Sequence, residues 1–463
     1  MNKDNDIIST IESTYGYYSS NIIKLLKSKD ILPGDKIEIN QNDKTLIGNL
    51  ITQNELGNEN NIIIKLENGY NIGIKYTNDT TLKKLSGSIK LEDFKIKNAT
   101  QSQNLPKISL LSTGGTIASR IDYQSGGVVM AMKPEEIFAG LPELFKEITF
   151  EDVKHLFSFG SEDLSKNEWK KIAEEVASQI NDNDINGVVI THGTDTMGYT
   201  SAILSFMLQD LPMPVVLTGA QKSSDRGSYD GATNLIAASR VAAKSDLASV
   251  LVAMHHTSDD NYIQLSRGTK VRKMHTSRRD AFQTINESPV GLISPDGKIT
   301  QLIDDIPKRS DGNVHLMNKF DDNIALIKIY PGINPELLDW YIDRNVKGII
   351  IEGTGLGHVP TYPDKTNMSW TPSIQRAIDE NIYVGMTSQC LNGRVHPFVY
   401  RALRSNYQIG VSYLQDMLPE TALLKLGWVL GNYDYEDLRA TMEQNIAGEI
   451  NLSIKFKEYS QNE

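Results

Sequence analysis

Residues 108–119 read ISLLSTGGTIAS and contain the transition that decides the fold. The apolar run ISLLST (108–113) is typical of a strand buried on both faces in a parallel sheet. It ends in Gly114-Gly115, a glycine pair that permits a tight turn and the close approach of a ligand to the backbone. Ligands of open α/β sheets bind beyond the carboxyl ends of strands, so this turn is the first candidate for a functional site.

The same transition occurs twice more along the chain. Strand GVVIT (187–191) runs into HGTDT (192–196), and strand PVVLT (214–218) runs into GAQK (219–222). Each turn delivers hydroxyl, carboxylate or amide side chains to a strand end. A glycine turn by itself indicates no more than a strand-to-loop connection, and Thr and Asp are common in turns and caps. The three turns are informative about function only when they are considered together.

Helices alternate with these strands, which predicts an α/β fold. Ser165 and Glu168 form a capping box ahead of WKKIAEEVASQI (169–180). After the polar interval 294–313, a second series of apolar strands indicates another, smaller α/β domain. Its strands are IALIKIY (324–330), GIIIEG (348–353) and YVGMTS (383–388).

The first hundred residues have a different pattern. Apolar positions at loosely helical spacing predict a short amphipathic helix within residues 6–28, and the alternating segments between 36 and 74 predict strands. Asn68-Gly69 is a strong hairpin signal. These features predict a small β-barrel or curled sheet, followed by a polar linker at residues 97–106.

A length of 463 residues and these boundaries predict a multi-domain globular protein. We expect an N-terminal helix and β-barrel domain, a large α/β domain, a smaller C-terminal α/β domain and a tail, at residues 1–100, 105–305, 322–445 and 446–463. No apolar run is long enough for a membrane span and the start lacks a secretory pattern, so a cytoplasmic protein is expected. The single Cys390 fits a small core residue in a reducing compartment.

The chain contains three motifs in this order: TGGTIAS (113–119), HGTDTMGYT (192–200) and TGAQK (218–222). Together they resemble the motifs of the asparaginase and glutaminase family with a threonine nucleophile. The resemblance spans roughly residues 105–440. It implies a two-domain parallel-sheet sandwich and hydrolysis of a side-chain amide. In this family the C-terminal domain can complete a neighbouring subunit's pocket, which implies at least a homodimer.

The resemblance also implies site residues. Thr116 matches the hinge-loop threonine, Thr194 and Asp195 the second threonine with its carboxylate, and Lys273 the lysine that completes the group. Tyr123 is similar to the mobile-loop tyrosine that orients the first threonine. The implied substrate-binding residues are Gly115, Gly193, Ser161 and Glu162, although Glu162 stands where the family often has Gln.

The residue types suit this chemistry. A threonine hydroxyl is a weak nucleophile at neutral pH and needs a base, which a neutral Lys273 could supply. Burial favours a neutral lysine, whereas Asp195 favours the ammonium, so sharing of a proton among Lys273, Asp195 and Thr194 is a hypothesis. Whether Thr116 or Thr194 attacks stays open. His255-His256 does not predict a metal site, because adjacent strand residues point to opposite faces and no metal-binding motif accompanies them.

The layout of an N-terminal domain ahead of the asparaginase-like part resembles the D-subunit family of the archaeal tRNA-dependent amidotransferases. Segments 221–235, 271–282 and 417–431 share the resemblance. It implies glutamine as ammonia donor and an E subunit that uses ATP and Mg to convert Glu-tRNA(Gln) into Gln-tRNA(Gln), in a heterotetramer with two copies of each subunit. No cofactor is implied for this chain.

A formal net charge of −11 disfavours long-range attraction to tRNA, so we expect tRNA(Gln) to be contacted mainly through the partner. The basic stretch 267–279 leaves open a local contact with tRNA phosphates, a contact with the partner, or an ordinary charged surface. Two other interpretations of the chain are a free-standing asparaginase or glutaminase and a non-catalytic scaffold.

Overall fold

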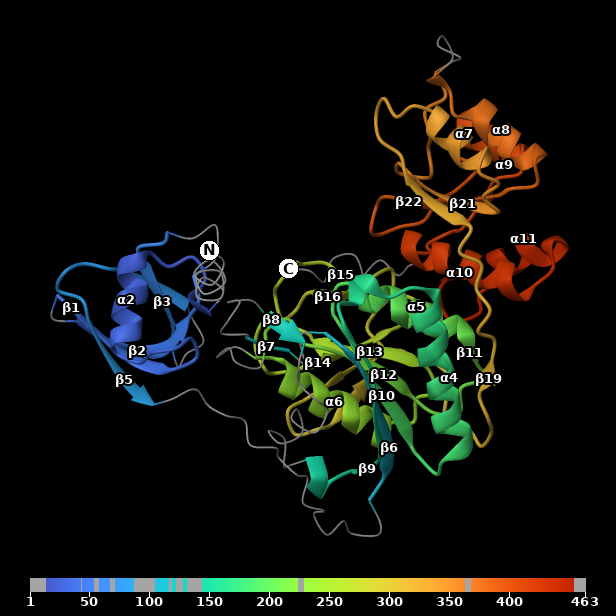
Figure 1. Cartoon of the computed structure of the whole chain (residues 1–463). Coiled ribbons are helices and arrows are strands. Elements are labelled where there is room, and N and C mark those ends of the chain that lie inside the picture. The colour runs from blue at the N-terminus through green and yellow to red at the C-terminus, as the bar shows by residue number, and fades with distance from the viewer. Residues whose placement is uncertain are drawn as a thin grey trace, which may run out of the picture.

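The computed structural model describes three structured regions (Figure 1). The described residues are 14–42, 44–53, 58–66, 71–86, 105–115, 119–121, 128–130, 144–223, 229–362 and 368–453. The predicted Asn68-Gly69 turn and most of the linker at 97–106 lie outside them.

The described part of the N-terminal region contains an antiparallel sheet with helix α2 (Ser20–Ser28) beside it (Figure 1). The strands pair in the order β4-β3-β2-β1-β5, and helix α2 buries Ile22 and Leu26 against them. Alternate strand residues such as Ile37 and Ile39 face the same core, as a period of two requires. The bounds are β1 Lys36–Gln41, β2 Lys44–Ile51, β3 Asn61–Lys65, β4 Asn71–Lys75 and β5 Thr81–Ser86.

Helix α2 begins later than the predicted span of residues 6–28. Gly16 has a φ of +64° and forms a backbone bridge with Gln53. A Cβ at Gly16 would lie 2.2 Å from the Gln53 carbonyl oxygen, so this close approach requires glycine. The bridge interrupts the predicted helix, and residues 1–13 lie outside the described part.

The large domain contains an eight-stranded sheet in the order β18-β17-β14-β13-β12-β10-β6-β9. Strands β9, β6, β10, β12 and β13 are parallel, whereas β14, β17 and β18 continue the sheet as antiparallel strands. This antiparallel edge was not predicted from the sequence, because its short strands carry no long apolar run. The bounds are β6 Lys107–Gly114, β9 Thr149–Phe159, β10 Gly187–Thr191, β12 Val215–Thr218, β13 Val250–His255, β14 Ile263–Arg267, β17 Gly291–Ile293 and β18 Ile299–Gln301.

Helices cover both faces of this sheet. Val188 and Ile190 of β10 face the core that contains α4 (Lys166–Asp182) and α5 (Met197–Met207). Val189 between them faces the core that contains α6 (Gly231–Lys244). Both faces are therefore apolar, which explains the continuous apolar runs. The predicted start of α4 is confirmed, since the Glu168 carboxylate accepts hydrogen bonds from the backbone N–H and the hydroxyl of Ser165 at 2.8 and 2.6 Å.

The smaller domain has a parallel sheet in the order β20-β21-β22-β23. Helix α10 (Pro419–Asn432) joins it to the large domain, because Trp428 stacks on Phe206 of α5 with ring centroids 5.6 Å apart. The strands are β20 Ile324–Lys328, β21 Gly348–Gly353, β22 Tyr383–Ser388 and β23 Ser412–Tyr413, and the other helices are α7 Glu336–Ile342, α8 Thr371–Asp379, α9 Arg401–Gln408 and α11 Tyr435–Glu443. The predicted α/β fold is thus confirmed in both series of strands.

The described residues also form several short elements. Strands β15 (Val271–Lys273) and β16 (Phe282–Thr284) form a hairpin, and the remaining strand pairs are β7 (Ser119–Ile121) with β8 (Val128–Met130) and β11 (Leu208–Gln209) with β19 (His315–Leu316). Among the described residues, 3₁₀ turns span Leu144–Lys146 and Ser161–Asp163. No helix among the described residues is long and apolar enough to cross a membrane.

Candidate active site

Three neighbouring parallel strands bring the quoted motifs to one edge of the large sheet. Thr191 at the end of β10 pairs with Ser112 of β6 on one side and with Thr218 of β12 on the other. The hydroxyl of Thr113 donates to the Thr191 carbonyl at 3.0 Å. The segments TGG, HGTDT and TGAQK therefore lie together although they are far apart in the sequence.

Two glycines allow these turns to touch. Gly115 has a φ of +81°, and a Cβ there would lie 2.5 Å from the Cα of Gly193. A Cβ on Gly193 would in turn lie 2.7 Å from the Cβ of Ser161. No side chain fits at either position, so the backbones of the first two motifs are in direct contact.

Lys273 joins the second motif from a distant part of the chain. Its ammonium donates to the Thr194 hydroxyl at 2.9 Å and to the Asp195 carboxylate at 2.7 Å. The Lys273 side chain is 14% exposed, whereas that of Asp195 is 68% exposed. The three residues thus form a contiguous group with one open side, and the hairpin of β15 and β16 positions the lysine.

Ser161 lies behind this group and holds Thr196. Its carbonyl accepts the Thr196 hydroxyl at 2.6 Å, and its own hydroxyl accepts the Thr196 N–H at 3.3 Å. Ser161 is buried, while the neighbouring Glu162 is exposed. Of the four residues predicted to bind substrate, Ser161 is therefore buried against the second motif, and Glu162 is exposed at the surface.

His192 supports the second motif from inside the domain. It is fully buried, and its Nδ1–H donates to the Gly193 carbonyl at 2.6 Å. Burial lowers the pKa of His192 to about 4, so the ring is neutral at pH 7. This N–H restrains the peptide that follows, immediately before Thr194.

A further clamp was not predicted from the sequence. The Asp230 carboxylate accepts the N–H groups of Gln221 and Lys222 at about 3.0 Å, and Asn234 donates to the Gly219 carbonyl at 2.9 Å. These bonds hold the TGAQK turn against the second motif. The Asp-Gly pair at the start of α6 was a visible signal, because Asp is favoured at helix starts.

The predicted residues Thr116 and Tyr123 lie outside the described residues. His255 and His256 both make hydrogen bonds: His255 to Asn234 and Asp260, and His256 to Gln264. Among the described residues, no cluster of His, Cys, Asp and Glu has the geometry to hold a metal ion.

The prediction of a buried Cys390 was wrong. Cys390 is exposed in the turn after β22, where its N–H donates to the Ser388 hydroxyl. Composition suggested a core residue, but the position lies at the carboxyl end of a strand, where the chain leaves the sheet.

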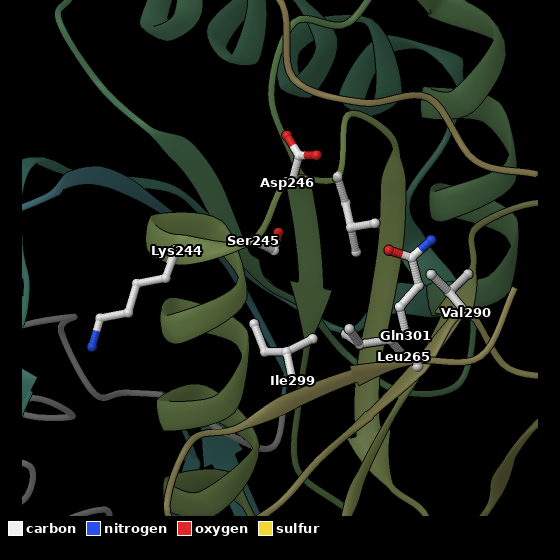
Figure 2. Close-up of a pocket in the computed structure, with 9 residues that line it drawn as sticks. Lys244, Ser245, Asp246, Leu265, Val290, Ile299 and Gln301 are labelled. Carbon is white, nitrogen blue, oxygen red and sulfur yellow. The ribbon is translucent and has the colours of Figure 1, made fainter. Parts of the chain in front are cut away.

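The large domain also contains a hollow at the other ends of the sheet strands, opposite the motif turns. Figure 2 shows it where α6 ends and β13 begins, with Lys244, Ser245 and Asp246 on one side and Val290 and Gln301 on the other. This is the amino end of β13, whereas the motif turns follow the carboxyl ends of the parallel strands. The hollow is therefore separate from the candidate active site.

The fold and this site define an amidohydrolase-like protein of the asparaginase class. The family models "Asparaginase, N-terminal" and "Glutaminase/Asparaginase C-terminal domain" match residues 107–304 and 323–442, which confirms the predicted asparaginase-like fold. Among solved structures, the chain is similar to the L-asparaginase of Thermococcus kodakarensis, with 32% identity, a TM-score of 0.66 and coverage of 75% of this chain and all of the other. L-asparaginase I from Vibrio cholerae gives 29% identity and a TM-score of 0.63, with the same coverage.

The N-terminal region indicates to which family of asparaginase-like proteins the chain belongs. Residues 31–85 match the "GatD N-terminal domain" model. The chain is 46% identical to the D subunit of the glutamyl-tRNA(Gln) amidotransferase of Pyrococcus horikoshii, over 94% of this chain and 99% of that protein. The protein of the same name from Thermococcus kodakarensis is 48% identical over 89% of this chain and 92% of its own length. The chain belongs to the family of glutamyl-tRNA(Gln) amidotransferase D subunits.

Proposed function

We propose that this chain hydrolyses the side-chain amide of glutamine and supplies the ammonia to a partner E subunit, which converts Glu-tRNA(Gln) into Gln-tRNA(Gln). The observation that carries the proposal is the contact of Lys273 with both Thr194 and Asp195 at a glycine-rich sheet edge. Membership of the D-subunit family favours this function over that of a free-standing asparaginase.

The proposed reaction begins with attack of a threonine hydroxyl on the amide carbon. A C–O bond forms, the hydroxyl proton passes toward the base, and the C–N bond breaks as ammonia leaves with an added proton. Water then hydrolyses the acyl-threonine ester to release glutamate and restore the hydroxyl. Lys273 and Asp195 are the groups that would hold the proton between steps. The Thr194 hydroxyl contacts the Lys273 amine at 2.9 Å, and whether Thr194 or Thr116 is the attacking group stays open.

Charge that develops on the amide oxygen requires preorganised donors. The backbone N–H groups at Gly115 and Gly193 are the proposed donors, because the close contact of these turns excludes side chains and brings peptide dipoles to the site. Ser161 and Glu162 would hold the α-amino and α-carboxylate end of glutamine, and Tyr123 would orient Thr116.

The proposed assembly contains two copies of this chain and two of the E subunit, with the homodimer formed through the asparaginase-like domains. ATP and Mg would be used by the partner, this chain would need no cofactor, and tRNA(Gln) would be bound mainly by the partner in the cytoplasm. A closed route between the two kinds of chain would keep ammonia neutral, because free ammonia is mostly protonated at neutral pH and then does not attack.

The test is glutamine-dependent formation of Gln-tRNA(Gln) by the chain mixed with its E subunit and ATP, compared with each protein alone. Product on mixing, with loss in a Thr194→Ala variant, supports the proposal. No gain on mixing, together with vigorous asparagine hydrolysis by the chain alone, would instead identify a free-standing asparaginase.

A further inference from the structure

A line of hydrogen bonds runs behind the candidate active site and is not explained by the reaction above. His255, at the end of β13, has no exposed side-chain surface and contacts acceptors with both ring nitrogens. Nδ1 lies 2.7 Å from Oδ1 of Asn234, and Nε2 lies 3.1 Å from Oδ1 of Asp260. A fully buried polar ring with two fixed partners is costly unless both bonds are made.

Both hydrogen-bond partners of His255 present an oxygen to the ring. The amide nitrogen of Asn234 donates to the Gly219 carbonyl at 2.9 Å and to the Asp230 carboxylate at 3.2 Å, so its Oδ1 must face the imidazole. The opposite amide orientation would place Oδ1 against two acceptors. Asn234 Oδ1 and the Asp260 carboxylate can only accept, so both bonds are made when His255 carries both ring protons. The bond from His255 also holds the pKa of Asp260 below its usual range.

At one end, this line of hydrogen bonds reaches the turn that packs against Thr194. Asn234 and Asp230 hold the turn that begins at Gly219, and a Cβ on Gly219 would lie 3.2 Å from Cγ2 of Thr194 and 2.6 Å from the His192 carbonyl oxygen. The Gly219 turn therefore packs directly on the threonine. A shift of Asn234 would be transmitted to that contact.

The other end reaches the hairpin that carries Lys273. Asp260 Oδ1 also accepts from Nη1 of Arg279 at 2.8 Å, and the same guanidinium donates to the Ser258 carbonyl. Arg279 lies in the tip of the β15–β16 hairpin, which the N–H of Met274 closes on the Ala281 carbonyl at 2.6 Å. Lys273 is the last residue of β15 before this tip.

We infer that Asp260, His255 and Asn234 form a positioning relay that sets the distance between the Lys273 ammonium and the Thr194 hydroxyl. The relay connects the β15–β16 hairpin, which carries Lys273, and the Gly219 turn, which packs on Thr194, to the same buried imidazole ring of His255. None of the three touches the reacting atoms. The functional consequence rests on the proposed amide hydrolysis, because a displacement of about 1 Å between catalytic groups can cost roughly 10²-fold in rate.

The kinetic test compares Asp260→Asn with the matched variant Asp259→Asn in the full chain with its E subunit, with glutamine hydrolysis followed by ammonia release. Asp259 is exposed and bonds to Thr257 and Asn261 within its own loop. We expect Asp260→Asn to lower kcat by ~10-fold or more with KM changed by less than ~2-fold, and Asp259→Asn to leave both near wild type. Arg279→Ala added to Asp260→Asn should cost little more, because both variants break one relay.

A second measurement does not depend on activity. In ¹⁵N-labelled full chain, the ring-nitrogen signals of His255, identified by their loss in His255→Gln, should shift in Asp260→Asn and stay unchanged in Asp259→Asn, because only Asp260 contacts the ring. Unchanged His255 signals in Asp260→Asn, or equal kcat in Asp260→Asn and Asp259→Asn, would overturn the relay. Absence of amide hydrolysis by wild type would instead count against the proposed function, and the nitrogen signals would still test the contact between His255 and Asp260.

Discussion

Lys273 Nζ lies 2.9 Å from Thr194 Oγ1, although 79 positions separate the two residues in the chain. The contact depends on a hairpin from one segment reaching the end of a strand from another. The chemistry proposed for this chain requires this contact, and it can be tested by substitution.

Lys273→Ala removes the group that contacts both Thr194 and Asp195. Glutamine hydrolysis should fall by about 10²- to 10⁴-fold, because a positioned acid or base typically contributes that factor. Steady-state ammonia release is the measurement, and Lys298→Ala, at an exposed lysine of the same domain, is the control. Equal activity of the two variants would remove Lys273 from the mechanism.

Gly115→Ala tests the backbone contact between the two motif turns. The added Cβ would meet Gly193 at 2.5 Å, so we expect loss of hydrolysis and a lower melting temperature. Gly332→Ala is a matched control, because Gly332 has a similar φ of +84° and open space around its Cβ position. Alanine at such a φ costs roughly 1–2 kcal/mol by itself. A similar effect of both substitutions would show that backbone strain, and not the contact, is decisive.

His192 should make stability depend on pH in a defined window. Its pKa is about 4 in the folded chain because of burial, against 6.5 for an unperturbed histidine. The unfolded chain therefore binds the extra proton first, and the stability contribution, complete above pH 6.5, is lost as pH falls toward 4. The full effect is about 3 kcal/mol.

The check is the free energy of unfolding of wild type and His192→Gln between pH 4 and 7.5. The variant should be less pH-dependent than wild type, and His315→Gln, at an exposed histidine, should follow wild type. A parallel pH dependence in wild type and His192→Gln would contradict the burial argument.

Lys270 and Asp416 form a fully buried ion pair between the two asparaginase-like domains, at 2.7 Å. Asp416→Ala would leave a buried ammonium without its carboxylate and should destabilise the chain by about 3–5 kcal/mol in denaturant titration. Asp322→Asn, which removes the exposed pair with Lys166, should change stability by roughly 0–1 kcal/mol. If both variants unfold at the same denaturant concentration, the buried pair does not hold the domains together.

The N-terminal domain has its own core around Ile22, Leu26 and Ile37, separate from the cores of the other domains. A chain that begins at residue 101 should therefore retain amide hydrolysis while glutamine-dependent Gln-tRNA(Gln) formation with the E subunit falls, since we propose that this domain helps to dock the partner or tRNA. The two assays on one preparation provide the comparison. Equal loss in both assays would assign the domain a purely structural role.

The sequence by itself determined the features that depend on neighbouring residues. The apolar run before Gly114, the glycine turns and the capping box of Ser165 and Glu168 are local signals, because burial period, turn geometry and helix capping act within a few positions. The family followed from three such turns in order, and the comparisons confirm it.

Tertiary structure alone decided which of these pieces touch. The contact of Gly115 with Gly193, the reach of Lys273 to Thr194, and the line from Asn234 through His255 to Asp260 join segments that are distant in the sequence. The exposure of Cys390 depends likewise on where its turn leaves the sheet. Such distances are set by strand order and by packing of helices between domains, and these are properties of the whole folded chain.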